Sequence, residues 1–188
     1  MKKFNLKEVL VPTISLFVIC AVVTTLLAVT NSITKPKIDQ LQIETANKTK
    51  AAVLSVAESF SEEKTVTLDD VTYTYYEGYD VEKNIVGYVF TTSSKGYGGD
   101  IVTMVGVKAD GTVSGMDFLS ISETAGLGMN ADTDEFKNQF KGKFGEIGLN
   151  KNTPAENEIQ ALTGATITSK AVTKAVNIAL ELFEEVNN

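Results

Sequence analysis

The chain has 188 residues, of which 43% are hydrophobic, and its formal net charge is −7. It contains no histidine, and its one cysteine is Cys20. These absences exclude Ser-His-Asp and Cys-His catalysis, and they exclude histidine-ligated metals, haem and cysteine-ligated clusters held by this chain alone. We therefore expect neither a catalytic side chain nor a metal site.

The first predicted element is a membrane-spanning helix at residues 9–34, which include no charged side chain. About 20 apolar residues suffice to cross a bilayer core. A cleaved signal peptide is the alternative, because Lys2, Lys3 and Lys7 precede the stretch. The apolar run is longer than the roughly 7–15 residues of a signal core, and no clear cleavage site follows it. We expect an uncleaved anchor in which Cys20 is an ordinary small apolar residue.

Charge predicts the orientation of this anchor. Lysines close to a first membrane helix favour a cytoplasmic N-terminus, and residues 1–8 form a basic tail. Residues 35–188 contain 14 Lys, no Arg and 23 Asp or Glu, a formal net charge of −9. A surface of this sign repels nucleic acid and anionic lipid. We expect a single-pass protein of the cell membrane with an extracytoplasmic C-terminal domain and no nucleic-acid partner.

After the anchor, apolar residues recur every three or four positions, which predicts a stalk helix at residues 35–60. Alternation of β-formers and polar residues then predicts strand structure from residue 64 to residue 80. Residues 84–94 and 100–122 complete a β meander, in which Asp110 and Gly111 supply a tight turn.

The glycines of "KGYGGD" predict a second sharp turn in this meander, at residues 96–99. A short helix is expected at residues 132–140, with Asp132, Thr133 or Asp134 at its start and Phe136 and Phe140 in the core. An amphipathic helix follows at residues 169–186. The fold class is α+β: a transmembrane helix (9–34), a stalk helix (35–60) and a domain (61–188) with a β meander and flanking helices.

A cluster of hydroxyl side chains precedes the last helix. The stretch "LTGATITSKAV" runs from Leu162 to Val172 and contains one glycine and four hydroxyls, at Thr163, Thr166, Thr168 and Ser169. A helix N-terminus presents free N–H donors and binds phosphate. The plainer interpretation makes Thr168 or Ser169 an N-cap and the remainder a polar loop. Spacing alone leaves both interpretations open.

The same stretch, "ALTGATITSKAV", resembles the S/T-G-A-T flavinylation motif of the FMN-binding domain. This domain occurs in the G subunit of the Rnf complex and in the C subunit of the sodium-pumping NADH:quinone reductase, where a threonine hydroxyl carries FMN through a phosphoester bond. The resemblance implies covalent FMN on Thr166, with Thr163, Gly164 and Ala165 around it. Thr168 and Ser169 would then cap the helix and bond the phosphate. Since this domain has no histidine or cysteine, a hydroxyl is the natural remaining attachment point.

A second stretch carries the resemblance as well. "SETAGLG", from Ser122 to Gly128, is similar to the family's E-T-P-G-L-G loop, which contacts the flavin. "KGYGGDIVTMVGVKADGTVSGMDFL", "FKNQFKGK" and "NSITKPKI" are also similar to the family, in the same order along nearly the whole chain. The resemblance implies flavin contacts from Glu123, Thr124, Gly126, Leu127 and Gly128.

Three side chains near these motifs have alternative interpretations. We expect Glu123 to position its loop or accept hydrogen bonds rather than to act as an acid or base. Tyr97 is either a residue that stacks on the flavin or a strand-edge aromatic. Lys137 is expected to face solvent, as are its neighbours Lys141 and Lys143.

The chain departs from the family pattern at two positions. Gln160 stands where the family often has an aspartate, three residues before the motif, in a region that the flavin transferase reads. Ala125 replaces the proline of the loop, which loosens the turn but keeps its glycines. Neither departure changes the hydroxyl of Thr166.

The resemblance implies a membrane-anchored flavoprotein of an ion-translocating electron transport complex of the Rnf type, a ferredoxin:NAD oxidoreductase. The chain would be an electron carrier within an oxidoreductase. Its partners would be the other membrane subunits and, during maturation, the flavin transferase. Two alternatives stay open. One is a stand-alone extracytoplasmic flavoprotein or quinone-reductase subunit. The other is a non-redox membrane-anchored binding or scaffold module in which "TGATITS" only caps a helix.

Overall fold

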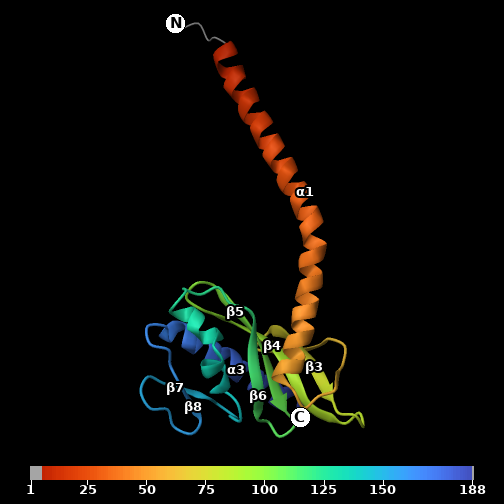
Figure 1. Ribbon diagram of the computed structural model, residues 1–188, viewed down its shortest axis with the longest axis vertical. Coiled ribbons are helices and arrows are strands. Elements are labelled where there is room, and N and C mark those ends of the chain that lie inside the picture. Colours follow the sequence, from red (N-terminus) through yellow and green to blue (C-terminus); the bar gives the residue numbers. More distant parts are fainter. Residues whose placement is uncertain (1–5, 188) are drawn as a thin grey trace. The chain divides into compact units, whose positions relative to one another are not determined.

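The computed structural model describes residues 6–187, and its chain divides into two units (Figure 1). The first unit extends to Glu44 and the second begins at Thr45. Helix α1, Leu6–Val53, supplies all of the described part of the first unit, and its last turns belong to the second. Of the predicted basic tail, residues 1–5 lie outside the described residues.

Helix α1 has the composition of a membrane helix. Among residues 6–187 it is the one helix that is long and apolar enough to cross a bilayer. Several of its hydroxyl groups bond within the helix: Thr13, Thr25 and Ser32 donate to the carbonyl four residues earlier, at 2.8, 2.7 and 2.9 Å. Such internal bonds suit a helix whose surroundings offer no water.

The predicted stalk differs in length from the helix observed. α1 continues past Pro36 and ends at Val53, rather than at residue 60. Leu54 is fully buried in the second unit, and the Ala57 N–H closes a turn on its carbonyl. The chain then enters strand β1, Ser59–Phe60. The helix thus ends where the chain turns at Leu54 and both Val53 and Leu54 fill the core.

The second unit is built on a six-stranded antiparallel sheet. Its order is β1-β3-β4-β5-β6, and β2 pairs with β3. This arrangement confirms the β meander predicted for the middle of the chain. The bounds are β2 Lys64–Leu68, β3 Val71–Tyr79, β4 Ile85–Lys95, β5 Asp100–Lys108 and β6 Val113–Ser120.

Tight turns set the pairing of these strands. Gly111 has a φ of +82° in the β5–β6 turn, as the Asp-Gly pair predicts. The Gly96 N–H bonds the Gly99 carbonyl at 2.8 Å in the predicted β4–β5 turn. Asp69 and Asp70, with φ of 48° and 62°, make a two-residue turn between β2 and β3. Short polar residues tolerate that left-handed backbone better than most others.

One face of the sheet packs against helix α3, Thr166–Asn187, which contacts β4 and β5 and lies behind the sheet in Figure 1. Alternate strand residues point to this helix because side chains in a strand change face at every position. They form a large core with the apolar side of α3, which includes Tyr88, Phe90, Val105, Val107, Val113, Met116, Val172, Val176, Leu180 and Phe183.

The opposite face packs against the end of α1 through a small core of Val53, Leu54, Val89 and Met104. Glycines on four strands, Gly78, Gly87, Gly106 and Gly115, make room for it. A Cβ on Gly106 would lie 2.2 Å from the Val53 carbonyl oxygen, and one on Gly78 would lie 2.6 Å from a Leu54 methyl. We call these four residues the glycine slot.

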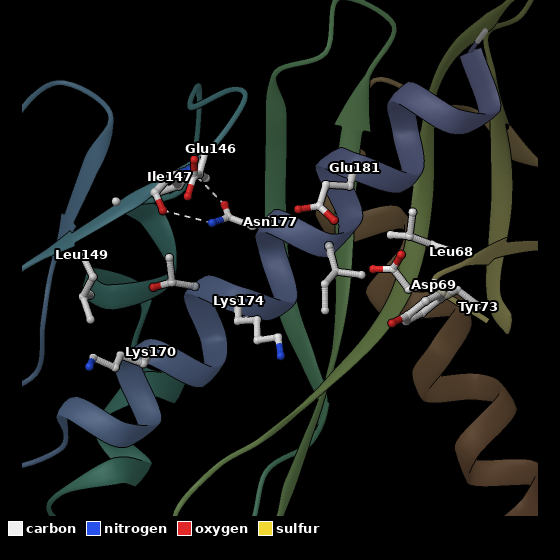
Figure 2. A pocket seen from close by; sticks show the side chains of 13 residues that line it. Leu68, Asp69, Tyr73, Glu146, Ile147, Leu149, Lys170, Lys174, Asn177 and Glu181 are labelled. Carbon is white, nitrogen blue, oxygen red and sulfur yellow. Dashed lines mark hydrogen bonds between the residues drawn. The ribbon is translucent and has the colours of Figure 1, made fainter. Parts of the chain in front are cut away.

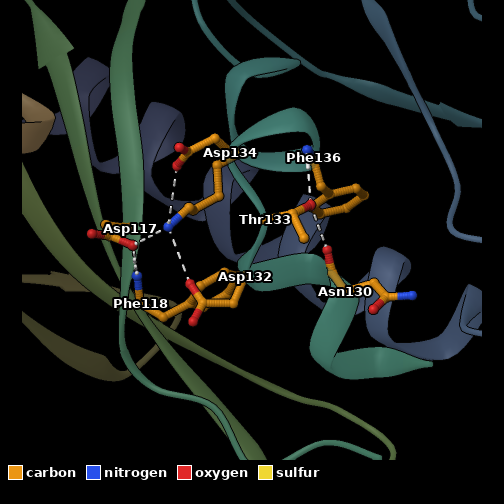
Figure 3. A network of polar contacts seen from close by, with 8 residues as sticks. Asp117, Phe118, Asn130, Asp132, Thr133, Asp134 and Phe136 are labelled. Atoms are coloured by element: carbon orange, nitrogen blue, oxygen red, sulfur yellow. Dashed lines mark hydrogen bonds and ion pairs between the residues drawn. The ribbon is translucent and has the colours of Figure 1, made fainter. Parts of the chain in front are cut away.

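A short helical segment follows β6. It comprises a 3₁₀ turn, η1, Gly128–Asp132, and helix α2, Asp134–Asn138, whose N-cap is Thr133 (Figure 3). Phe136 and Phe140 are buried, with ring centroids 5.7 Å apart, which confirms their predicted place in the core.

The solvent-facing position predicted for Lys137 is wrong. Its ammonium pairs with Asp117 at 2.9 Å and Asp132 at 3.1 Å (Figure 3). Burial lowers the pKa of Lys137, but its hydrogen bonds to the two carboxylates outweigh that effect and raise the pKa. The ion pairs therefore tie α2 to β6.

Residues 145–160 contain two short parallel strands, β7 Gly148–Asn150 and β8 Glu158–Gln160. The side chain of Asn177 on α3 holds this segment by pairing with both backbone groups of Ile147, at 3.0 and 3.1 Å. A groove of about 540 Å³ lies beside this contact, lined by α3, β7 and the β2–β3 turn (Figure 2). Of the two sequence motifs, Lys170 alone reaches it, and none of the residues expected to hold a cofactor does.

Candidate functional site

The hydroxyl-rich motif forms the N-terminus of α3. The helix begins at Thr166, three residues before the predicted start, and its first helical hydrogen bond joins the Ser169 N–H to the Ala165 carbonyl at 3.0 Å. The N–H groups of Thr166, Ile167 and Thr168 consequently have no carbonyl partner within the helix. Together with the helix dipole they form a site that favours an anion.

The capping role predicted for Thr168 and Ser169 is wrong, because both lie inside the first turn and are almost fully buried. The Ser169 hydroxyl instead accepts the Leu162 N–H and donates to the Ala165 carbonyl, each at 3.0 Å. It thus braces the loop before the helix. Gly164 in this loop has a φ of +76°, a conformation that suits glycine.

The "SETAGLG" loop forms the facing wall. The Leu127 N–H bonds the Thr124 carbonyl at 3.1 Å, and Gly126 has a φ of +75° in this turn. That geometry requires glycine at the third position of the turn. The Asn130 side chain donates to the Gly126 carbonyl at 3.2 Å and secures the turn to η1. Leu127 is thereby held close to Gly164, where a Cβ would lie 3.1 Å from its methyl group.

The end of the β4–β5 hairpin supplies the third wall. The Glu123 carboxylate accepts the backbone N–H groups of Tyr97 at 2.8 Å and Gly98 at 3.3 Å. This confirms the expectation that Glu123 accepts hydrogen bonds, here from the backbone of the neighbouring turn. The contact places Tyr97, a residue that is 72% exposed, at the same site as the motif.

These three walls enclose a cleft of about 520 Å³. It is lined by Tyr97, Glu123, Thr124, Leu127, Gly128, Gly164, Ala165, Thr166, Ile167 and Thr168. The two motifs are separated by 34 residues in the sequence between Gly128 and Thr163, and the fold brings them together.

Three of the predicted site residues do not line the cleft. Gly126 shapes the turn behind it, and Ser169 is buried beneath the motif. Thr163 is exposed and borders a separate groove of about 210 Å³ beside α2. In that groove Gln139 accepts the Gln160 N–H at 2.7 Å, so the backbone at the departure from the family pattern is held in place.

One lining residue was missed from the sequence. Ile167 is 55% exposed, although it is apolar and lies in the first turn of a helix. Its position in the sequence could have indicated this role, because Ile167 lies between Thr166 and Thr168, outside the apolar face of the helix. With Leu127 and Tyr97 it gives the cleft an apolar rim.

The chemical character of the residues that line the cleft suits a flavin mononucleotide. The free N–H groups of α3 suit a phosphate, and the apolar rim suits a planar aromatic ring. Gly128 leaves room for the side chains of Glu123 and Thr168, since a Cβ there would lie 2.7 Å from both Glu123 Oε2 and Thr168 Oγ1. No lysine is among the lining residues, so the helix N-terminus is the cleft's electropositive element.

Comparison with known proteins agrees with this arrangement. Residues 96–181 match the FMN-binding domain family. The chain is 34% identical to the G subunit of the Na⁺-translocating ferredoxin:NAD⁺ oxidoreductase complex of Acetobacterium woodii, over 92% of this chain and 90% of the relative. It is 37% identical to the G subunit of the proton-translocating ferredoxin:NAD⁺ oxidoreductase complex of Clostridium ljungdahlii, over 89% and 87% of the two chains.

Solved structures share the fold over a smaller part. The crystal structure of the C subunit of Na⁺-translocating NADH-quinone reductase from Parabacteroides distasonis has a TM-score of 0.50 and 26% identity, covering 58% of this chain and 59% of that one. NqrC of Shewanella oneidensis has a TM-score of 0.52 and 23% identity, covering 67% and 66%, and shows the fold alone. With relatives above 30% identity along about nine-tenths of its length, the chain belongs to the family of G subunits of ion-translocating ferredoxin:NAD⁺ oxidoreductase complexes.

Proposed function

We propose that this chain is the membrane-anchored flavoprotein subunit of an ion-translocating electron transport complex, and that it carries FMN on Thr166 through a phosphoester bond. The observation that carries the attachment is the position of Thr166. Among the four hydroxyls of "LTGATITSKAV", it is the one that both lines the cleft and is only partly buried.

The other hydroxyls each lack one of these properties. Thr168 lines the cleft but is 1% exposed, which restricts access for a modifying enzyme. Ser169 is buried and already makes two hydrogen bonds. Thr163 is exposed but borders the other groove. Accessibility and placement therefore favour Thr166 as the acceptor.

The charges around the cleft also favour a covalent link. Its lining includes the carboxylate of Glu123 and no basic side chain. A phosphate held only by helix N–H groups would meet that negative charge without a neutralising cation. A phosphoester bond to Thr166 fixes the phosphate at the N-terminus of α3 and does not depend on such a cation.

When bound, FMN supplies the ability to accept and release electrons. The chain's own residues hold and shield it. The N–H groups of the first turn of α3 would hold the phosphate, and Ser169 keeps the preceding loop in shape. Leu127, Ile167 and Tyr97 present apolar surface at the rim of the cleft, where a ring can be held out of water while staying within reach of a partner.

The proposed setting follows from the relatives and from the charge pattern. The chain would span the cell membrane once through residues 9–34, with its N-terminus in the cytoplasm and its flavin domain outside. It would exchange electrons with other membrane subunits of an Rnf-like complex, and a flavin transferase would attach the FMN. The match to G subunits along about nine-tenths of the chain, against a match to a C subunit of quinone reductase along 58% of it, favours this over the quinone-reductase alternative.

The test is in-gel flavin fluorescence of the denatured protein after co-expression with a flavin transferase. Wild type should fluoresce, Thr166→Ala should not, and Thr168→Ala and Thr163→Ala should keep the signal as matched hydroxyl deletions. Loss in Thr168→Ala alone would move the acceptor by two residues. Absence of fluorescence in wild type would refute the covalent model and favour a scaffold module.

A further inference from the structure

Two loops that are distant in the sequence meet at the cleft through one carboxylate. Residues 96–99 close the β4–β5 hairpin, whereas Glu123 lies after β6 in the "SETAGLG" loop. Glu123 Oε1 accepts two successive backbone N–H groups, those of Tyr97 and Gly98. Hydrogen bonds to a charged acceptor are roughly twice as strong as neutral ones, so this contact is the main polar link between the two loops.

Glycines allow the carboxylate to enter this space. A Cβ on Gly96 would lie 2.1 Å from Glu123 Oε1, and a Cβ on Gly128 would lie 2.7 Å from Glu123 Oε2. A Cβ on Gly98 would lie 2.2 Å from the Ser122 carbonyl oxygen. Backbone therefore approaches the Glu123 side chain and its neighbour from three positions that carry no side chain.

The partners of this carboxylate are neutral. Glu123 belongs to none of the ion pairs described among residues 6–187, which involve Lys64 and Lys137. Its charge is balanced by backbone dipoles, in a cleft that also holds the N-terminus of α3. A group placed in this way fixes backbone rather than pairing with another side chain.

We propose that Glu123 is a positioning residue that holds the Tyr97–Gly98 backbone as one wall of the flavin cleft, so that Tyr97 stays at its mouth. The contact between the loops is independent of the flavin, whereas its effect on the flavin rests on the proposed function. Glutamine keeps a carbonyl oxygen at the same place and should preserve the wall, while alanine should release it.

The first test is hydrogen exchange of the Tyr97 and Gly98 N–H groups by NMR, in the full-length chain in detergent, produced without flavin transferase. Glu123→Ala should raise their exchange rates by at least about tenfold, since each N–H loses a charged acceptor. Glu123→Gln should stay within about threefold of wild type, and Glu62→Ala removes an exposed carboxylate elsewhere as the control. Unchanged exchange in Glu123→Ala, or equal exchange in the Ala and Gln variants, would overturn the proposal.

A second variant disturbs the same contact through the β4–β5 turn and leaves Glu123 itself unchanged. Gly96→Ala should displace the carboxylate through its new methyl group and reproduce the faster exchange of Gly98 while Glu123 is intact. Wild-type exchange in this variant would contradict the geometry.

The third readout is the flavin spectrum of protein matured with the transferase. Glu123→Ala should change the fluorescence intensity of the native bound flavin, and Glu123→Gln should resemble wild type. If exchange rises but the spectrum stays unchanged, Glu123 does not position the flavin wall. If no flavin is attached in wild type, the proposed function fails while the exchange result still stands.

Discussion

The two faces of the sheet are covered in opposite ways. The face toward α3 is filled by large side chains, with Phe90 at its centre in ring contact with Tyr75 and Tyr88 at 5.8 and 6.1 Å. The face toward the end of α1 is hollowed by the glycine slot, so that Val53 and Leu54 reach the backbone of the sheet. One face is stabilised by volume, and the other depends on the absence of side chains.

The two faces should therefore tolerate different substitutions. On the α3 face, a substitution that shortens a large side chain leaves a cavity. On the α1 face, a Cβ added to a glycine of the slot would push the sheet away from the end of α1. The cleft belongs to the α3 face because it lies at that helix's N-terminus, so its shape depends on the side-chain core beneath it.

The largest effect is expected from Phe90→Ala. Removing a fully buried ring should lower the free energy of unfolding by about 3–5 kcal/mol, because the surroundings cannot collapse completely into the cavity. Denaturant unfolding followed by circular dichroism measures this loss. Phe90→Leu, which keeps most of the volume, should cost clearly less. A loss below about 1 kcal/mol for Phe90→Ala would show that this face does not rely on volume.

Gly106→Ala should have the next largest effect, on the opposite face. Its Cβ would meet the Val53 carbonyl at 2.2 Å for oxygen and 2.7 Å for carbon, and overpacking of this kind costs roughly 1–3 kcal/mol. Gly99→Ala is the matched control, since a Cβ there meets nothing within 4 Å. Equal stability of the two variants in the same unfolding experiment would remove the basis for the glycine slot.

The smallest effect concerns pH on the α1 face. Burial, followed by a hydrogen bond to Glu63, raises the pKa of Tyr76 to about 12. The folded state therefore keeps the Tyr76 proton that the unfolded chain releases near pH 10, so this contribution to stability is present below pH 10 and is lost as the pH rises toward 12.

Tyr76→Phe has no proton to lose at this position. Its free energy of unfolding should fall less steeply than that of wild type between pH 10 and 12, as measured by denaturant titration at each pH. Parallel pH profiles of the two proteins would show that Tyr76 is not held in its protonated form by the fold.

Local patterns predicted much of this structure. The Asp-Gly turn at residue 111, the glycine turn at 96–99 and the alternation in β4 and β5 all indicated the meander, because turn chemistry and period 2 act over a few residues. The Asp69–Asp70 turn was missed, since two aspartates signal a left-handed turn less strongly than glycine does.

The candidate site was predicted as two motifs rather than as a cleft. Resemblance supplied Thr166 and the "SETAGLG" loop, and the fold adds the relations that no local pattern contains. Among these are the bond from Leu162 to Ser169, the exposed Ile167, and the contact of Glu123 with the β4–β5 turn. Ser169 looked like a cap because its residue type suits one, but its burial depends on α3 packing against the sheet.

The glycine slot also decides where the flavin domain can be cut from its anchor. Residues 45–53 of α1 belong to the second unit, and Val53 and Leu54 fill the slot. A fragment that starts at residue 61 would lose this filling and β1, and it would expose an apolar trench floored by bare backbone. A water-soluble fragment intended for crystallisation or for redox titration should therefore keep the chain from Thr45 onward.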